Sequence, residues 1–269
     1  MKEEIKITPQ PHGFIEPEIQ EEDYILGDGM LVGEILQSNG QWDDYLPDTE
    51  IQHQWGLETS NCTSYATLNA IEILLKRKYG GVHNYSERGL GIVAGTYPPG
   101  NDPHKVAEAV RKNGIIPDEV LPFSSNTDTL EEYYSPSPLT DSFVQRAKEW
   151  LFWYDFKHDY VFTKGEASDV KRKKIMEALK YSPLGVSVYA WAEENGLYTK
   201  LGNDNHWTVL YGYKLGEYWK IYDSYDSTLK KLEWNYDFGI AKRYSIIKHG
   251  SVPKKRSFID IMKQLLCLK

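Results

Sequence analysis

The stretch QWGLETSNCTSYATLNAIEILL, residues 54–75, contains one of the two cysteines of this 269-residue chain and its first strong helical pattern. Apolar residues recur there at intervals of three and four, which places them on one face of a helix. We therefore predict a helix from Cys62 to Tyr79, with Ser60 or Asn61 as its N-cap. The apolar stripe consists of Ala66, Ala70, Ile73 and Leu74.

Cys62 stands at the start of this predicted helix, directly after a polar loop. A thiol reacts as its thiolate, and a helix N-terminus and a neighbouring imidazolium both lower the pKa of a thiol. A free cysteine in a helix is more often a small core residue than a nucleophile. A catalytic role for Cys62 therefore requires a histidine that is itself held by a third polar group.

His206 is the candidate partner. Among the seven histidines it alone opens a predicted strand, HWTVLYGY at 206–213. A second predicted strand, YWKIYDS at 218–224, follows closely and contains Asp223. Neighbouring strands would bring His206 and Asp223 to one edge of a sheet. We expect that edge to face the helix that carries Cys62.

Helical patterns come first along the chain and strand patterns follow. We predict further helices after Asp102, over 142–157 and from about Ser168, and strands over 185–191, 206–213, 218–224 and 241–248. This order is typical of an α+β fold with a helical half and a sheet half. The predicted organisation is an N-terminal extension (1–40), one domain (41–250) and a C-terminal helical tail (251–269).

The composition is that of a globular protein, with 41% hydrophobic residues and a formal net charge of −8. No run of Lys and Arg is long enough to follow a phosphate backbone, so we expect no nucleic-acid partner. We also expect no membrane partner, because no apolar run approaches the length of a membrane span. The sequence shows no signal-peptide pattern and has only two distant cysteines, which indicates cytoplasmic synthesis without disulfides. No His, Cys and carboxylate spacing is typical of a metal site, so we expect no metal and no cofactor.

Five segments resemble, in order, the papain-like cysteine peptidase family, over roughly residues 45–225. SNCTSYA follows a loop glutamine, as the family's nucleophile does. NYSERGL resembles the family's LSEQ-L stretch, and AVRKNGIIPDEVLPF resembles its G-I-x-x-E-x-x-Y-P-Y. YSPLGVSVYA resembles its G-P-V-S-V strand. NHWTVLYGY followed by YWKIYDSYDS resembles its H-A-V-x-x-x-G-Y and W-x-x-x-N-S-W pair.

The resemblance implies a papain-like fold, with a helical left half whose central helix carries Cys62 and a β-sheet right half that carries His206 and Asp223. It implies that Cys62 is the nucleophile, that His206 is the general base and acid, and that Asp223 replaces the usual Asn. Gln54 would stabilise the oxyanion together with the Cys62 backbone N–H, and Gln52 is the rival for that role. The residues implied to line the substrate groove are Gly100, Asn205 and Tyr225.

The expected function is a cysteine peptidase acting on a peptide or protein substrate, with no indication of oligomeric state. Three departures from the family keep alternatives open. Gln54 lies eight residues before Cys62 (62 − 54), two more than usual, the family disulfide beside the nucleophile is absent, and Tyr225 replaces a shielding tryptophan. The alternatives are a non-catalytic binding or structural protein of this fold, for example in a virus particle, and a cell-wall peptide amidase with the same triad. We expect the acidic, turn-rich residues 1–40 to lie over or beside the cleft.

Overall fold

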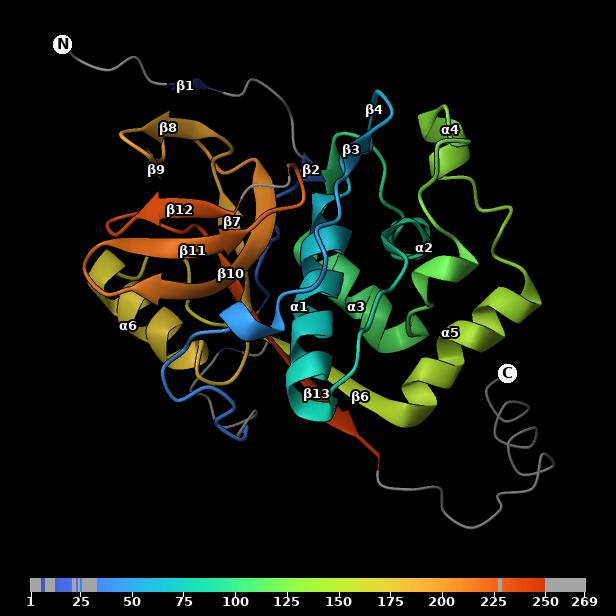
Figure 1. Cartoon of the computed structure of the whole chain (residues 1–269), viewed down its shortest axis with the longest axis horizontal. Coiled ribbons are helices and arrows are strands. Elements are labelled where there is room, and N and C mark those ends of the chain that lie inside the picture. The colour runs from blue at the N-terminus through green and yellow to red at the C-terminus, as the bar shows by residue number, and fades with distance from the viewer. Residues whose placement is uncertain are drawn as a thin grey trace.

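The computed structural model describes residues 6–7, 13–20, 23, 25, 33–226 and 229–249. Figure 1 shows two halves: α2, α3, α4 and α5 lie on one side, a strongly curved sheet with α6 lies on the other, and α1 runs between them. The helices are α1 (Cys62–Tyr79), α2 (Glu87–Ala94), α3 (Pro103–Asn113), α4 (Leu130–Tyr133), α5 (Asp141–Trp153) and α6 (Ser168–Ala178), with 3-10 turns η1 (Asp43–Tyr45) and η2 (Asp118–Val120). In the view of Figure 1, the helical half lies on the right.

The large sheet has nine strands in the order β1-β8-β9-β12-β11-β10-β7-β13-β6. Two further pairs, β2 with β5 and β3 with β4, lie outside it. The strand bounds are β1 (Lys6–Ile7), β2 (Gly13–Phe14), β3 (His53–Gln54), β4 (Leu57–Glu58), β5 (Gly100–Asn101), β6 (Tyr154–Tyr160), β7 (Leu184–Val188), β8 (Ala192–Glu194), β9 (Leu197–Tyr198), β10 (His206–Lys214), β11 (Tyr218–Tyr222), β12 (Lys230–Glu233) and β13 (Ala241–Lys248).

Helix α1 is buried on every face from Cys62 to Leu75, because it packs between the two halves. The strands β10 and β13 contact it on one side, and α2 and α3 on the other. A helix in that position buries all its faces, and α1 accordingly buries polar side chains such as Asn69 and Glu72 as well as its apolar residues. The predicted bounds of 62–79 are confirmed, and Gly80 ends the helix with φ of 72°.

The α+β fold class is confirmed, but the predicted order of helices followed by strands holds only in part, because β6 lies between α5 and α6. Helix α3 begins as expected, because Asp102 accepts a hydrogen bond from the His104 backbone N–H and Pro103 occupies the first helical position. The predicted helix over 142–157 is wrong at its C-terminal end. The chain leaves α5 at Trp153 and enters β6, which pairs antiparallel with β13. Phe156, His158 and Tyr160 alternate inward there, so pairing with β13 overrides the helical pattern.

Strands β7, β10, β11 and β13 occupy the predicted segments with ends shifted by up to three residues. The proposed domain limits at residues 40 and 250 stay predictions. The predicted C-terminal helical tail, 251–269, lies outside the described residues. Within the described part of the chain, no helix is long and apolar enough to cross a membrane.

Candidate active site

Cys62 opens α1 and is completely buried. The loop before it is fixed by the helical half: the Asn61 side-chain amide donates to the Glu87 carbonyl and the Tyr133 hydroxyl, at 2.9 and 3.0 Å. Tyr134 donates its hydroxyl to the Thr59 carbonyl at 2.7 Å. Asn61 is therefore a tertiary anchor and makes no side-chain cap hydrogen bond to α1. The Asn61 carbonyl accepts from the Ser64 and Tyr65 backbone N–H groups, at 3.0 and 3.2 Å, and so begins the helix next to the thiol.

His206 and Asp223 lie at one edge of the sheet, as their strand positions predicted. His206 is the first residue of β10, and Asp223 directly follows β11, which pairs antiparallel with β10. His206 Nε2 lies 2.6 Å from Asp223 Oδ1, and both side chains are completely buried. Because Nε2 is held by the carboxylate, Nδ1 is the ring nitrogen left for chemistry with a thiol.

Cys62 and His206 face one another across the boundary between the halves. The Cys62 Sγ accepts a hydrogen bond from the Trp207 backbone N–H at 3.4 Å, which ties the thiol to the start of β10. Burial by itself lowers the pKa of His206. The negative charge of Asp223 and the contact with Cys62 outweigh that effect and raise the pKa to about 10. The site therefore keeps His206 protonated, as an imidazolium next to the sulfur, at neutral pH.

Two aromatic rings enclose His206. The Trp191 ring lies 5.6 Å from the imidazole centroid, and the Tyr225 ring lies 6.5 Å from it, both edge to face. Trp191 also donates its indole N–H to Asp223 Oδ2 at 3.2 Å. Tyr225 thus lies beside His206, but Trp191, which was not identified from the sequence, is the residue that contacts Asp223. The only sequence signal for Trp191 was its place at the end of a predicted strand.

Lys230 is a second residue that sequence reasoning missed. Its ammonium lies 2.8 Å from Asp223 Oδ2, and its side chain is 1% exposed. Asp223 therefore contacts His206 through one carboxylate oxygen and Lys230 through the other. Burial raises the pKa of Asp223, but the charges of His206 and Lys230 reverse this and keep it well below its usual range.

The two candidate oxyanion glutamines lie on a hairpin. The strands β3 and β4 pair His53 with Glu58, and both turn residues, Trp55 and Gly56, have positive φ, 51° and 83°. Such a turn closes a two-residue hairpin. Trp55, at the tip of the hairpin, is 56% exposed.

Gln52 lies at the base of that hairpin and is completely buried. Its Oε1 accepts from the Ser224 hydroxyl at 3.0 Å, beside Asp223, and its Nε2 donates to Glu58 Oε1 at 2.6 Å. Gln54 is half-buried, and its side-chain amide donates to the Ile51 carbonyl at 2.6 Å. The structure thus ties Gln52, rather than Gln54, to Ser224, the neighbour of Asp223.

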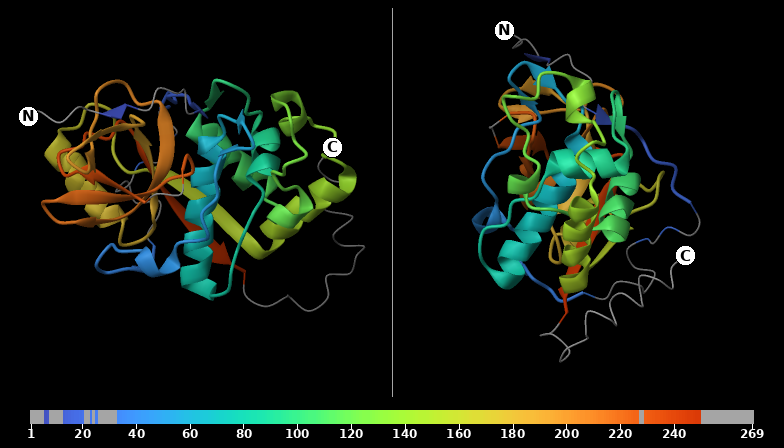
Figure 2. Two further views of the ribbon diagram at one scale, coloured as in Figure 1. Left: turned by 45° about the horizontal axis from the view of Figure 1, so that its top comes forward. Right: turned by 90° about the vertical axis from the view of Figure 1, so that its right-hand side faces the viewer.

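Residues 13–15 of the N-terminal extension contact the segments that are predicted to line a substrate groove. The Phe14 backbone N–H donates to the Asn205 carbonyl at 3.4 Å, and Gly13–Phe14 pairs in parallel with Gly100–Asn101. The Phe14 ring stacks on Trp207 with centroids 5.9 Å apart. Figures 1 and 2 both show β2 beside the N-terminal end of α1. The extension thus contacts two of the three predicted groove residues, Gly100 and Asn205.

Glycine is required on both sides of this contact. Gly13 has φ of 92°, and a Cβ there would lie 2.1 Å from the Ser60 carbonyl oxygen. Gly100 has φ of 137°, and a Cβ there would lie 1.9 Å from the Gly13 carbonyl oxygen. Only glycine tolerates these conformations and this approach of backbone to backbone.

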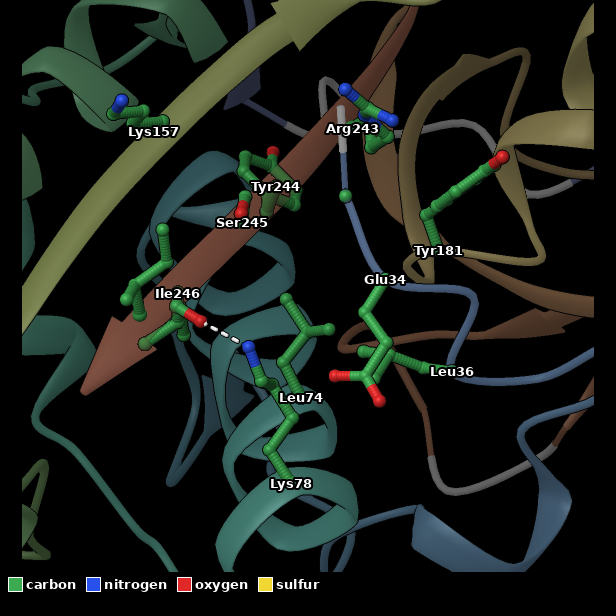
Figure 3. A pocket seen from close by; sticks show the side chains of 12 residues that line it. Glu34, Leu36, Leu74, Lys78, Lys157, Tyr181, Arg243, Tyr244, Ser245 and Ile246 are labelled. Atoms are coloured by element: carbon green, nitrogen blue, oxygen red, sulfur yellow. Dashed lines mark hydrogen bonds between the residues drawn. The ribbon is translucent and has the colours of Figure 1, made fainter. Parts of the chain in front are cut away.

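A cavity of about 320 Å³ lies away from the triad, between the later turns of α1, strand β13 and residues 33–36 (Figure 3). Lys78 is engaged in its wall, because its ammonium donates to the Ile246 carbonyl at 2.6 Å. Among the described residues, no group of three or more His, Cys, Asp or Glu side chains is placed to hold a metal ion.

Solved structures of cysteine proteases resemble this chain in fold. Digestive procathepsin L 3 from the larval midgut of Tenebrio molitor matches it with a TM-score of 0.55 at 15% identity, over 83% of this chain and 73% of that one. Bromelain from Ananas comosus, solved with the inhibitor E64, matches with a TM-score of 0.54 at 15% identity, over 76% of this chain and 97% of that one. The fold is papain-like.

A third papain-like structure, the proform of the ragweed pollen allergen Amb a 11, matches with a TM-score of 0.52 at 13% identity, over 76% of this chain and 65% of that one. No protein-family model matches the sequence, and the comparison with curated proteins also finds no match. The papain-like fold predicted from five short segments is therefore confirmed by the arrangement of the chain rather than by overall sequence identity.

Proposed function

We propose that this chain is a cysteine peptidase that hydrolyses peptide bonds through Cys62, His206 and Asp223. The observation that carries the proposal is the buried imidazole of His206, held through Nε2 by Asp223 and in contact with Cys62 at the start of α1. A cysteine that only packs in the core needs neither a histidine partner nor a helix N-terminus. A nucleophilic thiolate does need them, because the imidazolium and the helix N-terminus both stabilise its negative charge.

The geometry supports an ordered mechanism. The Cys62 thiolate attacks the carbonyl carbon, and the electron pair of the C=O bond moves to the oxygen. The tetrahedral intermediate collapses, His206 gives its Nδ1 proton to the leaving amine, and the C–N bond breaks. Water then attacks the thioester, with neutral His206 taking its proton, and the C–S bond breaks to release the acid product and restore the Cys62 thiolate and the His206 imidazolium.

We propose Gln52 as the oxyanion donor together with the Cys62 backbone N–H. Gln52 is fully buried at the base of the β3–β4 hairpin and is fixed by Ser224, the neighbour of Asp223. Its Nε2 also donates to Glu58 Oε1 at 2.6 Å, so the side-chain amide is held at both its oxygen and its nitrogen. Gln54 already donates within its own loop. A fixed donor needs no reorganisation as charge develops, which is the source of oxyanion stabilisation.

Residues 13–15 lie where an extended substrate would pair with Gly100–Asn101, so we propose that the described form is latent. Neither Cys62 nor His206 has exposed surface in this form. The same observation favours a second candidate, a papain-fold binding or structural protein that never opens. Peptide turnover separates the two candidates.

The experiment uses the full chain and a Gly13→Ala variant that weakens the groove contact, each with a Cys62→Ala counterpart. The substrates are casein, a mixed fluorogenic peptide library and cell-wall cross-link peptides. The peptidase proposal predicts cleavage that increases in Gly13→Ala and disappears with Cys62→Ala. Efficient thiol labelling of Gly13→Ala without cleavage of any substrate would favour the non-catalytic protein.

A further inference from the structure

Asp223 is held from two sides by opposite charges. His206 Nε2 lies 2.6 Å from Oδ1, and Lys230 Nζ lies 2.8 Å from Oδ2. All three side chains are 0 or 1% exposed. Removing one partner from a buried ion pair leaves an uncompensated charge, so each of these groups depends on the others.

The sheet explains why Lys230 reaches this position. Lys230 is the first residue of β12 and pairs across the strands with Ile221 in β11. Asp223 follows β11 by one residue, so the connection from β11 to β12 brings the two charges together. The ammonium also lies 5.0 Å from the Trp191 ring centroid and 5.7 Å from that of Tyr198. Aromatic faces on a buried cation add to its stability.

The net charge of the groups around the Cys62 thiolate depends on whether Lys230 is present. A thiolate, an imidazolium and a neutral amide sum to zero. Replacing the amide by the Asp223 carboxylate adds one negative charge in a buried site, and this charge disfavours the thiolate. The Lys230 ammonium restores the sum to zero.

We propose that Lys230 is a positioning residue of the catalytic group, which holds the Asp223 carboxylate against His206 and balances its charge so that the thiolate form of Cys62 is retained. The inference rests on the proposed function for its catalytic meaning. Its physical content, a charge balance at Cys62, can be measured without any substrate.

Other charged and titratable groups face this pair and bear on the measurement. Asp226 Oδ1 lies 2.6 Å from Lys230 Nζ, and its side chain is 49% exposed. Because Asp226 stays in place when Asp223 is changed, Lys230 retains one carboxylate partner, and this moderates the effect of that change. The titratable groups that face Asp223 and Lys230 are His206, Asp226, Tyr198 and Tyr225, and Cys62 is reached through His206.

The test measures the pH dependence of Cys62 alkylation by iodoacetamide in chains that carry Cys267→Ser, so that one thiol reports. Lys230→Met removes the positive charge, and the remaining negative charge moves the midpoint of the labelling profile up by about one pH unit. Asp223→Asn removes the negative charge and moves the midpoint down. The double variant has the charge sum of the parent, so its midpoint returns to within about 0.3 pH unit of the parent.

Lys220→Met is the matched control. Lys220 also pairs with a carboxylate, Asp43 at 2.8 Å, and lies on β11 of the same strand pair, away from His206. Its loss leaves the labelling midpoint in place. A purely structural role of Lys230 would lower the melting temperature without opposite shifts in the two single variants, so thermal unfolding is recorded for every protein.

Opposite shifts in the single variants with a return in the double variant support the inference. An unmoved midpoint in Lys230→Met, or a double variant further from the parent than either single variant, overturns it. If Lys230→Met does not fold, the labelling midpoint of Asp223→Asn is compared with that of the double variant, and the inference predicts a higher midpoint in the double variant. The proposed function fails separately, when Cys62 labels with these shifts but no peptide is cleaved.

Discussion

The Gly13→Ala substitution should release the N-terminal segment from the groove. Alanine at φ of 92° is strained, and its Cβ would lie 2.1 Å from the Ser60 carbonyl oxygen, which belongs to the fixed loop before Cys62. The left-handed region costs a non-glycine residue about 1 to 2 kcal/mol, and the clash adds to this. The segment cannot relieve both without leaving its place between Ser60 and Gly100.

The size of the effect follows from what holds the segment. Two backbone hydrogen bonds, Phe14 to Asn205 and Ile15 to Asn101, contribute about 1 kcal/mol each. The stacked Phe14–Trp207 pair adds about 1 kcal/mol. About 3 kcal/mol corresponds to an open fraction of about one in 100 to 200. Gly13→Ala should therefore raise the Cys62 labelling rate by up to about 100-fold.

The assay is the initial rate of Cys62 alkylation at fixed pH in the Cys267→Ser chain. Gly216→Ala is the matched control, because Gly216 has φ of 76° but its Cβ would meet nothing within 4 Å. It imposes similar backbone strain at a remote turn and should leave the rate unchanged. A Gly13→Ala rate within twofold of the parent, or an equal rise in Gly216→Ala, would refute the reasoning.

Two further predictions concern the oxyanion donor and a buried carboxyl group. Gln52→Ala should lower kcat by about 100-fold or more with little change in thiol labelling, while Gln54→Ala should stay within about threefold of the parent; equal losses in both would contradict the assignment. Burial, together with the charge of Glu50, raises the pKa of Glu72 well above its usual value, so the folded state binds its proton more tightly than the unfolded state. Glu72 therefore lowers the free energy of unfolding as pH rises above about 4.5, by up to about 1.4 kcal/mol per pH unit, until the folded carboxyl ionises. Denaturant titrations across pH should show that Glu72→Gln is more stable than the parent at neutral pH and flattens the decline, and an unchanged pH dependence would contradict this.

The residues that sequence reasoning found are those whose position follows from a local pattern. Cys62 begins a helix with a strong apolar period, and His206 begins a strand bounded by polar residues. Asp223 follows the next strand, and antiparallel pairing of β10 with β11 brings it to His206. The α+β order was predictable for the same reason, because period and punctuation differ clearly between the two halves.

The features that were missed depend on pairing between distant segments. Lys230 reaches Asp223 only through the register of β11 and β12, and nothing local distinguishes it from a surface lysine. Gln52 was recognised only as the rival of Gln54, because the features that distinguish it, its burial and its contact with Ser224, are tertiary. The aromatic run that ends α5 fits both a helix and a strand until β13 pairs with it. In each case the deciding interaction is tertiary, and a single sequence does not contain it as a pattern.

The most direct test of the central claim is the pH profile of Cys62 alkylation in the Cys267→Ser chain, with and without His206→Ala. A thiolate paired with the His206 imidazolium predicts labelling that persists at about pH 5.5, well below the free-thiol midpoint near 8.5. His206→Ala should abolish that acidic reactivity and move the profile to the free-thiol midpoint. Superimposable profiles with a free-thiol midpoint in both proteins would contradict the claim that Cys62 and His206 form a catalytic pair.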